Sequence, residues 1–476
     1  MRPAAFFAFT TFVMTTVISP AASQTPDLRV LDPQYRRVVQ GDALPSDASP
    51  TCDVLILGGG TGAIAAANAV ARQSLSVIIV EPTDTLGGQF TAQLVAAPDE
   101  NSYIEQRGGC ATDAYRDLRE RVRELSAALP GAKSGAAKNI GAGWVSRVCA
   151  PPELWATAIE EIIEKRSGNQ GIKRVYRRHQ IRAVAKLANG LVNYVDIINL
   201  DTGKLTRIGA RYVIDATEDG QPLHLAGCET SIGQEGRGEF NEQHAPETPR
   251  PDWVQSFTYC FLLRWQDNPA NRVLVGRPAE YEYFQSLGEY TLDYVYSERG
   301  TVGYKVLTRV EGAGGSFWTY RRLLAANSFT GKKSPDGDIA LMNWRGNDFH
   351  EESYLGKPPE EQARVLNRGQ QFAQGFCYWL QNECPRDDGQ GVGYPEMQLV
   401  TGEGAQLVAG VGADGYAAHP YVRESRRLQA KVMLTENDLT APESDADAKW
   451  GTEFADSVGC ALYAVDIHPA KGEPPL

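Results

Sequence analysis

A run of small residues at positions 58–63 is the part of the chain best suited to chemistry. It reads Gly58-Gly59-Gly60-Thr61-Gly62-Ala63, follows an apolar segment, and fits the pattern G-x-G-x-x-A. In such a pattern the first glycine allows a tight turn, the second lets the backbone approach a pyrophosphate, and a small third residue lets helix and strand pack closely. The helix that follows would present free amide groups to phosphate oxygens. Gly58, Gly60, Thr61, Gly62 and Ala63 are therefore predicted to bind a dinucleotide.

The elements around this motif occur in the order that such a site requires. Residues 52–57 and 76–81 are apolar, β-branched runs typical of buried parallel strands, and residues 61–72 have the small side chains of a closely packed helix. Glu81 ends the second strand about 20 residues after Gly60, where a carboxylate accepts hydrogen bonds from ribose hydroxyls. An acid at this position argues against a 2′-phosphate. FAD and NAD both remain possible on these residues, and the alternative is a glycine-rich turn in an ordinary α/β domain.

A second glycine cluster, Gly410-Val411-Gly412-Ala413-Asp414-Gly415, fits the same pattern. Pro420 follows so closely that no helix can begin there to receive phosphates. We interpret this stretch as a loop. With a single dinucleotide motif, an enzyme with separate FAD and NAD(P)H domains is disfavoured.

The rest of the chain alternates helical and strand patterns. Helices are expected at residues 112–129, 151–165 and 360–383, a β-meander at 180–215, and an aromatic-rich strand at 257–265. These patterns predict an α/β fold with a Rossmann-type domain at 51–234 that includes the meander, and an inserted α+β substrate domain at 235–400. Residues 401–476 would return to the first domain.

The net charge and the N-terminal residues indicate which partners the protein can bind and where in the cell it is found. The net charge of -12 disfavours binding to nucleic acid or to an anionic membrane. Arg2, the apolar run 4–18 and small residues at 20–23 predict a signal peptide at 1–23, with Gln24 as the mature N-terminus. The alternative, a membrane anchor, needs a run of about 20 residues. We therefore expect a secreted or periplasmic protein without a membrane span in the mature chain, and an exposed leader at 24–50.

Export permits disulfides among the eight cysteines, but their spacing does not give the connectivity. Cys377 and Cys384 are not expected to pair, since seven residues of helix span roughly 10 Å. Cys110 and Cys149 are the other candidate pair, and Cys52 is expected to be a small buried side chain. No spacing of Cys and His predicts a metal site.

Several segments together resemble the FAD-dependent oxidoreductases of the glutathione-reductase-like flavoprotein superfamily. The matching segments are the glycine motif with Glu81, Leu86-Gly87-Gly88-Gln89-Phe90-Thr91, Gly143-Trp144-Val145-Ser146-Arg147-Val148-Cys149, Asp215-Ala216-Thr217-Glu218-Asp219-Gly220, Asn343-Trp344-Arg345-Gly346-Asn347-Asp348, and Pro420-Tyr421-Val422-Arg423-Glu424-Ser425-Arg426-Arg427. The resemblance implies FAD rather than NAD. It also implies that Gly87, Gly88 and Gln89 lie along the cofactor, that residues 215–217 end beside the first strand, and that part of the meander meets the adenine.

The sequence departs from this family in two places. The family usually ends with a strand and a helix that close over the flavin, and no such segment is recognisable before Leu476. Asp219-Gly220 stands where the family tends to have Gly-Asp.

Candidates for catalysis cluster near residue 420. His419 could act as a base or orient a substrate, and Arg423 could neutralise a flavin anion or bind a substrate carboxylate. The alternatives are a packing histidine, and a basic helix face in which Arg423, Arg426 and Arg427 pair with Glu424 and Glu436. Asn347 and Asp348 are explained equally well by turn formation.

These observations predict an exported FAD-dependent oxidoreductase. It would oxidise a small organic substrate by hydride transfer to the flavin, which O2 or an electron carrier would reoxidise. Two alternatives stay open: a non-catalytic exported binding protein on a degenerate flavoprotein scaffold, and an NAD-dependent dehydrogenase.

Overall fold

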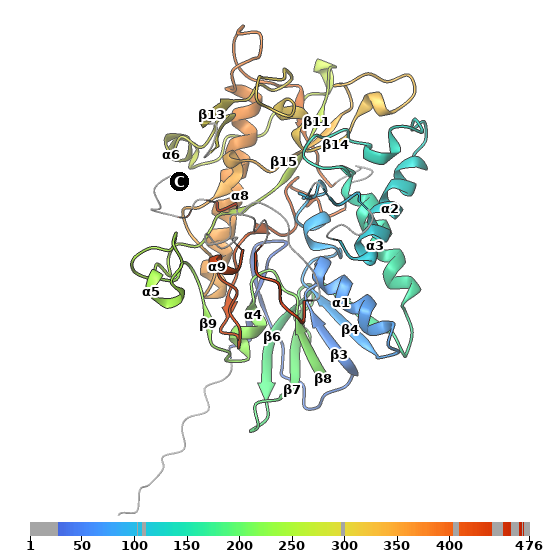
Figure 1. Cartoon of the computed structure of the whole chain (residues 1–476), viewed down its shortest axis with the longest axis vertical. Coiled ribbons are helices and arrows are strands. Elements are labelled where there is room, and N and C mark those ends of the chain that lie inside the picture. The colour runs from blue at the N-terminus through green and yellow to red at the C-terminus, as the bar shows by residue number, and fades with distance from the viewer. Residues whose placement is uncertain are drawn as a thin grey trace, which may run out of the picture.

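The computed structural model describes residues 27–101, 103–106, 111–296, 300–402, 409–439, 451–457, 466–468 and 470. A six-stranded mixed sheet with the order β5-β4-β3-β8-β7-β6 forms its lower half in Figure 1. The strands are β3 (Thr51–Leu57), β4 (Val77–Glu81), β5 (Ile172–Arg177), β6 (His179–Lys186), β7 (Val192–Asn199) and β8 (Leu205–Asp215). The first three and β8 run parallel, whereas β6, β7 and β8 form the antiparallel meander that the turn signals predict.

Alternation along β3 and β4 gives the sheet two buried faces. Val54 and Ile56 pack beneath the helices α1 (Thr61–Ala71), α2 (Asp113–Ala127) and α3 (Pro152–Lys165). Leu55 and Leu57 face the other way, toward apolar side chains of the meander. Burial on both faces explains why β3 and β4 are apolar at nearly every position. The α/β fold with a Rossmann-type unit and a meander is therefore confirmed.

A second, antiparallel sheet of order β14-β15-β11-β17 lies above the first in Figure 1, beside the long helix α8 (Pro359–Asn382). Its strands are β11 (Phe261–Trp265), β14 (Arg322–Leu324), β15 (Ile339–Met342) and β17 (Met397–Leu399). Aromatic side chains of this sheet and of α8 form a large apolar cluster. Cys260 and Leu262, however, pack in the same cluster as β3. The division at residues 235 and 400 into an inserted domain stays a prediction.

Short elements complete the described part of the chain. A three-stranded sheet joins β10 (Phe257–Thr258), β16 (Asp348–Phe349) and β18 (Tyr421–Val422), and two-stranded pairs join β12 (Asp293–Tyr296) with β13 (Gly300–Gly303) and β9 (Thr230–Ser231) with β19 (Arg427–Leu428). The short helices are α4 (Gln221–Leu225), α5 (Arg237–Phe240), α6 (Tyr281–Ser286), α7 (Phe317–Tyr320) and α9 (Glu436–Leu439). Single 3-10 turns are η1 (Gly88–Phe90), η2 (Ala137–Asn139), η3 (Pro269–Asn271), η4 (Ala326–Ser328) and η5 (Arg345–Asn347).

The predicted exposed leader at 24–50 is wrong for its middle part. Residues 29–40 form a hairpin of β1 (Arg29–Asp32) and β2 (Arg37–Gln40). Val30 packs with Leu200 and Leu205 next to the meander, and Leu31 joins the aromatic cluster around α8. The hairpin is too short to show clear periodicity, so its burial is not visible in the sequence.

The second glycine cluster and two of the cysteine expectations can be compared with the structure, whereas the terminal segments largely cannot. Residues 409–420 contain turns and isolated bridges and no helix, so the second glycine cluster is a loop, as predicted. Cys377 and Cys384 are buried free thiols, and Cys52 is buried in the sheet. Cys110 and the signal segment 1–23 lie outside the described residues, as does part of the C-terminal return segment. Among the helices of the described residues, none has the length and apolar character to cross a bilayer.

Candidate dinucleotide-binding site

The turn between β3 and α1 has the backbone that the glycine pattern predicts. Gly58 has a φ of 101°, and a Cβ there would overlap the carbonyl group of Ala216 at the end of β8. Gly60 is the N-cap of α1 and, having no side chain, leaves the first amides of the helix uncapped. Bare amides at the positive end of a helix form an anion site. Gly58 therefore allows the strands to approach, and Gly60 keeps the helix end open.

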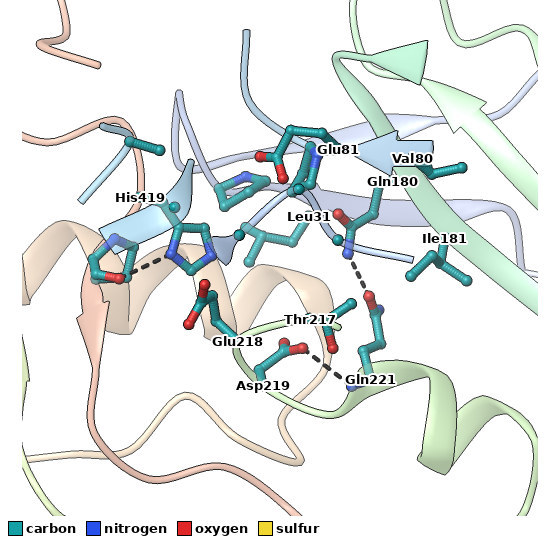
Figure 2. A pocket seen from close by; sticks show the side chains of 18 of the residues that line it. Leu31, Val80, Glu81, Gln180, Ile181, Thr217, Glu218, Asp219, Gln221 and His419 are labelled. Carbon is teal, nitrogen blue, oxygen red and sulfur yellow. Dashed lines mark hydrogen bonds between the residues drawn. The ribbon is translucent and has the colours of Figure 1, made fainter. Parts of the chain in front are cut away.

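A cavity of about 740 Å³, its open mouth included, lies in front of this turn. Figure 2 shows its walls, which come from the ends of β3, β4 and β8, from the start of β6, and from α8 and the segment before β18. The residues that line it include Gly58–Gly60, Glu81, Gly88, His179–Ile181, Glu218, Tyr354 and His419. In α/β sheets, ligands bind at the carboxyl ends of parallel strands. This cavity lies at the same place, at the carboxyl ends of β3, β4 and β8.

Glu81 lies at the end of β4 with its side chain in the cavity (Figure 2). Its Oε1 accepts hydrogen bonds from the backbone amide (2.8 Å) and the hydroxyl (2.6 Å) of Thr83. Oε2 faces the glycine turn, 2.6 Å from where a Cβ on Gly59 would be. Burial raises the pKa of Glu81 although the bonds from Thr83 oppose the shift. The carboxyl group is thus held in one orientation with one oxygen available to ribose hydroxyls.

Glu218 is a site residue that the sequence analysis missed. Its Oε1 is 2.9 Å from where a Cβ on Gly60 would be and 3.0 Å from where one on Gly88 would be. Burial raises the pKa of Glu218, with His419 acting in the opposite direction. A neutral carboxyl group at this place can donate a hydrogen bond to a phosphate oxygen, whereas a carboxylate would repel it. The one signal in the sequence was the departure from the family pattern at the adjacent Asp219-Gly220.

The segment 87–89 meets the cavity at Gly88. Gly88 lines the cavity beside Gly60, and both Gly87 and Gly88 have positive φ values, of 112° and 47°. A Cβ on Gly87 would press on Ile159 and Thr91, so this glycine serves packing. Gly87 and Gln89 are not part of the cavity wall. Of the α1 residues, Ala63 is fully buried against the sheet, whereas Thr61 and Gly62 are exposed at the open end of the helix.

The two catalytic candidates lie in different surroundings. His419 lines the cavity beside Glu218 (Figure 2), and its Nδ1 donates to the carbonyl group of Pro420 at 2.8 Å. Arg423 instead donates to the Thr258 hydroxyl (2.6 Å) and to the buried carboxylate of Asp348 (3.0 Å), outside the cavity wall. The cavity therefore includes His419 and excludes Arg423.

The alternative of a basic helix face near residue 423 is wrong. Tyr421–Val422 and Arg427–Leu428 form the short strands β18 and β19, and residues 423–426 between them are not helical. Arg426 donates to the carbonyl group of Asp219, and Arg427 pairs with Glu235 and Glu424. Glu436 binds His244 instead. The expected pairing with Glu424 occurs for Arg427, but each arginine also has a partner far away in the sequence, which a local pattern cannot reveal.

Asp348 is the centre of a buried polar cluster next to Arg423. Its second carboxylate oxygen accepts a hydrogen bond from Nδ1 of His468 at 2.7 Å. Burial alone would raise the pKa of Asp348, but Arg423 and His468 outweigh it and hold this pKa below its usual range. Asn347 bonds the backbone of Trp344, Tyr259 and Met342, so its role is to hold the turn. Within the described residues, no group of three His, Cys, Asp or Glu side chains is arranged to hold a metal ion.

The walls of the cavity fit an adenine dinucleotide. The uncapped start of α1 lies next to Glu81 at the end of β4, and the meander segment His179–Ile181 lines the same cavity. Tyr354 is 4% exposed, and its hydroxyl has no hydrogen-bond partner among the described residues, although it lines the cavity. Buried polar groups are normally satisfied, so this hydroxyl points to a missing ligand. The fold and the site define a dinucleotide-binding protein.

Sequence comparison identifies the dinucleotide. The profile of the FAD dependent oxidoreductase family matches residues 53–475, so the chain belongs to this family. This match confirms the resemblance seen in the motifs, FAD as the cofactor, and the class of enzyme, an FAD-dependent oxidoreductase. The search of curated protein sequences found no match.

Solved structures resemble the chain only in part. A 3-ketosteroid-delta4-(5alpha)-dehydrogenase from Rhodococcus jostii RHA1 is 13% identical, with a TM-score of 0.24, over 38% of this chain and 49% of that one. An L-amino acid deaminase from Proteus vulgaris is 12% identical, with a TM-score of 0.25, over 48% of this chain and 57% of that one. The chain thus spans about half the length of these proteins. Similarities of this size carry no conclusion about the activity or the substrate.

Proposed function

We propose that the cavity holds the adenosine diphosphate part of FAD and that the chain oxidises a small organic substrate. The observation that carries this proposal is the convergence of the uncapped start of α1, the Glu81 carboxyl group and the meander segment on a single cavity. When bound, FAD would supply the acceptor for a hydride from the substrate. O2 or an electron carrier is proposed as the final acceptor.

Different residues of the cavity would bind different parts of FAD. The amides at Thr61 and Gly62 would donate to the diphosphate, and Oε2 of Glu81 would accept from the ribose hydroxyls. Because Nδ1 of His419 donates to a carbonyl group, its Nε2 is left on the cavity side. In the neutral ring this Nε2 is a hydrogen-bond acceptor, so we propose that His419 accepts a hydrogen bond from a hydroxyl group of the ligand.

Spectroscopy of the purified full-length protein tests the function directly. We expect the two-band visible spectrum of oxidised flavin, either as purified or after incubation with FAD, and FAD binding much tighter than NAD binding in calorimetry. A colourless protein that FAD cannot reconstitute would refute the proposal. Tighter binding of NAD would support the dehydrogenase alternative.

We also propose that the substrate binds near Arg423, beside the three-stranded sheet of β16, β10 and β18. This guanidinium group is 8% exposed and contacts Asp348 and Tyr421. We expect Arg423→Lys to change KM or kcat for the substrate and to leave the FAD affinity unchanged. Loss of FAD with unchanged turnover per bound flavin would contradict this assignment.

Export is proposed from the N-terminal residues. The apolar run 4–18 and the small residues at 20–23 are the supporting observations. Mass spectrometry of the protein from the periplasm or the medium should find a chain that begins at Gln24. An intact Met1 on protein retained in the cytoplasm would contradict export.

A further inference from the structure

The hairpin β1–β2 precedes the part of the chain that the family profile matches, which begins at residue 53. It nevertheless lies against the six-stranded sheet and against α8, and residues 30–34 are all buried. Leu31 and Pro33 line the dinucleotide cavity. A segment outside the family region thus provides part of the wall of the cofactor site.

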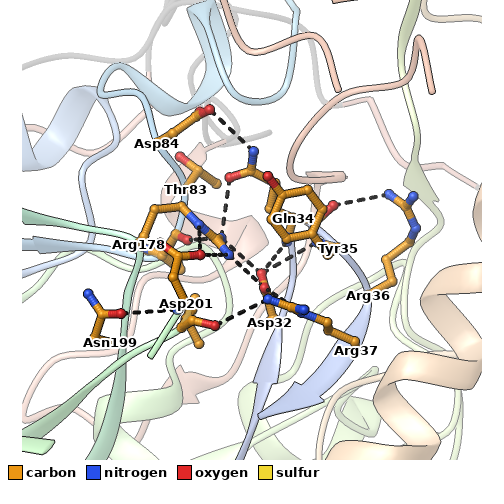
Figure 3. Close-up of polar contacts among 12 residues, drawn as sticks. Asp32, Gln34, Tyr35, Arg36, Arg37, Thr83, Asp84, Arg178, Asn199 and Asp201 are labelled. Atoms are coloured by element: carbon orange, nitrogen blue, oxygen red, sulfur yellow. Dashed lines mark hydrogen bonds and ion pairs between the residues drawn. The ribbon is translucent and has the colours of Figure 1, made fainter. Parts of the chain in front are cut away.

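A buried ion pair joins this hairpin to the sheet (Figure 3). The carboxylate of Asp32 is fully buried and accepts from both terminal nitrogens of Arg178, at 2.9 Å from Nη1 and 2.7 Å from Nη2. Such a two-bond pairing fixes the relative orientation of the two groups. The amides of Gln34 and Tyr35 also donate to Asp32, so the carboxylate shapes the hairpin turn as well.

Arg178 connects the hairpin with two other parts of the site. It lies between β5 and β6 with a φ of 57°, which is unusual for a residue other than glycine. Its Nη1 donates to the carbonyl group of Pro82 (3.0 Å), directly after Glu81, and its Nη2 donates to Asp201 in the β7–β8 turn (3.1 Å). One guanidinium group therefore sets the positions of the hairpin, the end of β4 and the start of β6.

The residues beside these anchors form one end of the cavity. Leu31 and Pro33 flank Asp32, Pro82 follows Glu81, and His179–Ile181 follow Arg178. Because Pro82 directly follows Glu81 and its carbonyl group accepts from Arg178, the residues held by these anchors lie next to the Glu81 end of the cavity. If Glu81 binds the ribose, the next group of the ligand at this end is the adenine base.

We infer that the N-terminal hairpin is a built part of the adenine site, in which Leu31 and Pro33 contact the base and the Asp32–Arg178 pair positions them. The ligand class is the adenosine part of a dinucleotide, so the inference rests on the proposed function. An apolar wall suits the flat face of a purine. Because Arg178 donates to Asp32, Asp201 and Pro82, it is not available to a 2′-phosphate, and the site favours adenosine without one.

Two pairs of variants in the full-length chain test this inference. Leu31→Ala removes apolar contact with the base, and its control is Val30→Ala, at the neighbouring buried position whose side chain packs against Leu200 and Leu205. Asp32→Asn weakens the positioning pair, and its control is Asp196→Asn. Asp196 is 1% exposed and is bound by two nitrogens of Arg207 in the meander, away from the cavity wall.

The dissociation constants of FAD and of ADP, the latter measured by competition, are the readouts. We expect Leu31→Ala and Asp32→Asn to weaken both ligands by the same factor, roughly 10-fold, since only the shared adenosine part is affected. Val30→Ala and Asp196→Asn should lower the melting temperature to a similar extent and leave both constants unchanged. If the hairpin only supported the fold, Leu31→Ala and Asp32→Asn would change the dissociation constants no more than their controls do.

Two results would overturn the inference in distinguishable ways. If the wild-type chain binds FAD while Leu31→Ala and Asp32→Asn bind FAD and ADP as tightly as their controls, the hairpin has no part in adenine binding and the proposed function stands. If the wild-type chain binds neither FAD nor ADP, both the proposed function and the inference fail.

Discussion

Gly60→Val is expected to weaken cofactor binding strongly while the chain stays folded. Gly60 has an ordinary φ of -68°, and the one atom within 4 Å of a Cβ at this position is the movable Oε1 of Glu218. Valine in place of glycine at an N-cap costs about 1 kcal/mol, against a typical domain stability of about 5–15 kcal/mol. The added methyl groups would, however, occupy the space in front of the helix amides.

The loss of affinity follows from the bonds that become impossible. Two hydrogen bonds from helix amides to a charged diphosphate contribute about 3 kcal/mol or more, so the dissociation constant of FAD should rise roughly 100-fold. The measurements are the flavin absorbance of the purified variant, a titration with FAD, and urea unfolding of the cofactor-free chain.

Gly58→Ala is the matched control for the fold. Its φ of 101° strains any side chain by about 1–3 kcal/mol, and the overlap with the Ala216 carbonyl group adds to this by forcing the ends of β3 and β8 apart. We expect Gly58→Ala to lose more than about 3 kcal/mol of unfolding free energy. A Gly60→Val variant that binds FAD with wild-type affinity would falsify our interpretation of the helix end, and a fully stable Gly58→Ala variant would refute the packing argument.

Three further predictions concern buried polar groups. The pKa of Glu218 is raised, so the FAD affinity of the wild type should fall as rising pH deprotonates this carboxyl group beside the diphosphate, and Glu218→Gln should remove that pH dependence in FAD titrations. The pKa of Asp348 is lowered in the folded chain, so this carboxylate stabilises the fold at pH values above the pKa of about 3.9 that it has in the unfolded chain. This contribution is lost as the pH falls through the folded-state pKa. Asp348→Asn, which leaves Arg423 without its carboxylate, should cost about 3–5 kcal/mol and flatten the acid limb of urea midpoints plotted against pH; an unchanged limb would contradict this. Tyr354→Phe should leave the stability of the cofactor-free chain within about 0.5 kcal/mol and weaken FAD roughly 5-fold, and equal FAD binding would show that the hydroxyl does not meet the ligand.

Local patterns were sufficient for the dinucleotide-binding unit. Leu55 and Ile56 belong to a run that is apolar on both faces, the glycine pattern specifies a turn into a helix, and Glu81 follows at the distance set by one strand-helix-strand unit. Each of these features depends on residues close together in the chain. The sequence therefore determined β3, α1 and β4 and the side of the sheet on which a ligand lies.

Tertiary structure decided which distant residues meet at that place. Glu218 enters the phosphate region because β8 pairs with β3, and Asp32 reaches Arg178 across 146 positions of the chain. The short hairpin carries no periodic signal, and the partners of Arg423 come from β10 and β16. Buried charges obtain their partners from packing rather than from spacing along the chain. The strand–turn–helix unit was thus predictable from sequence alone, whereas the walls of the cavity and the surroundings of each candidate catalytic residue depend on the fold.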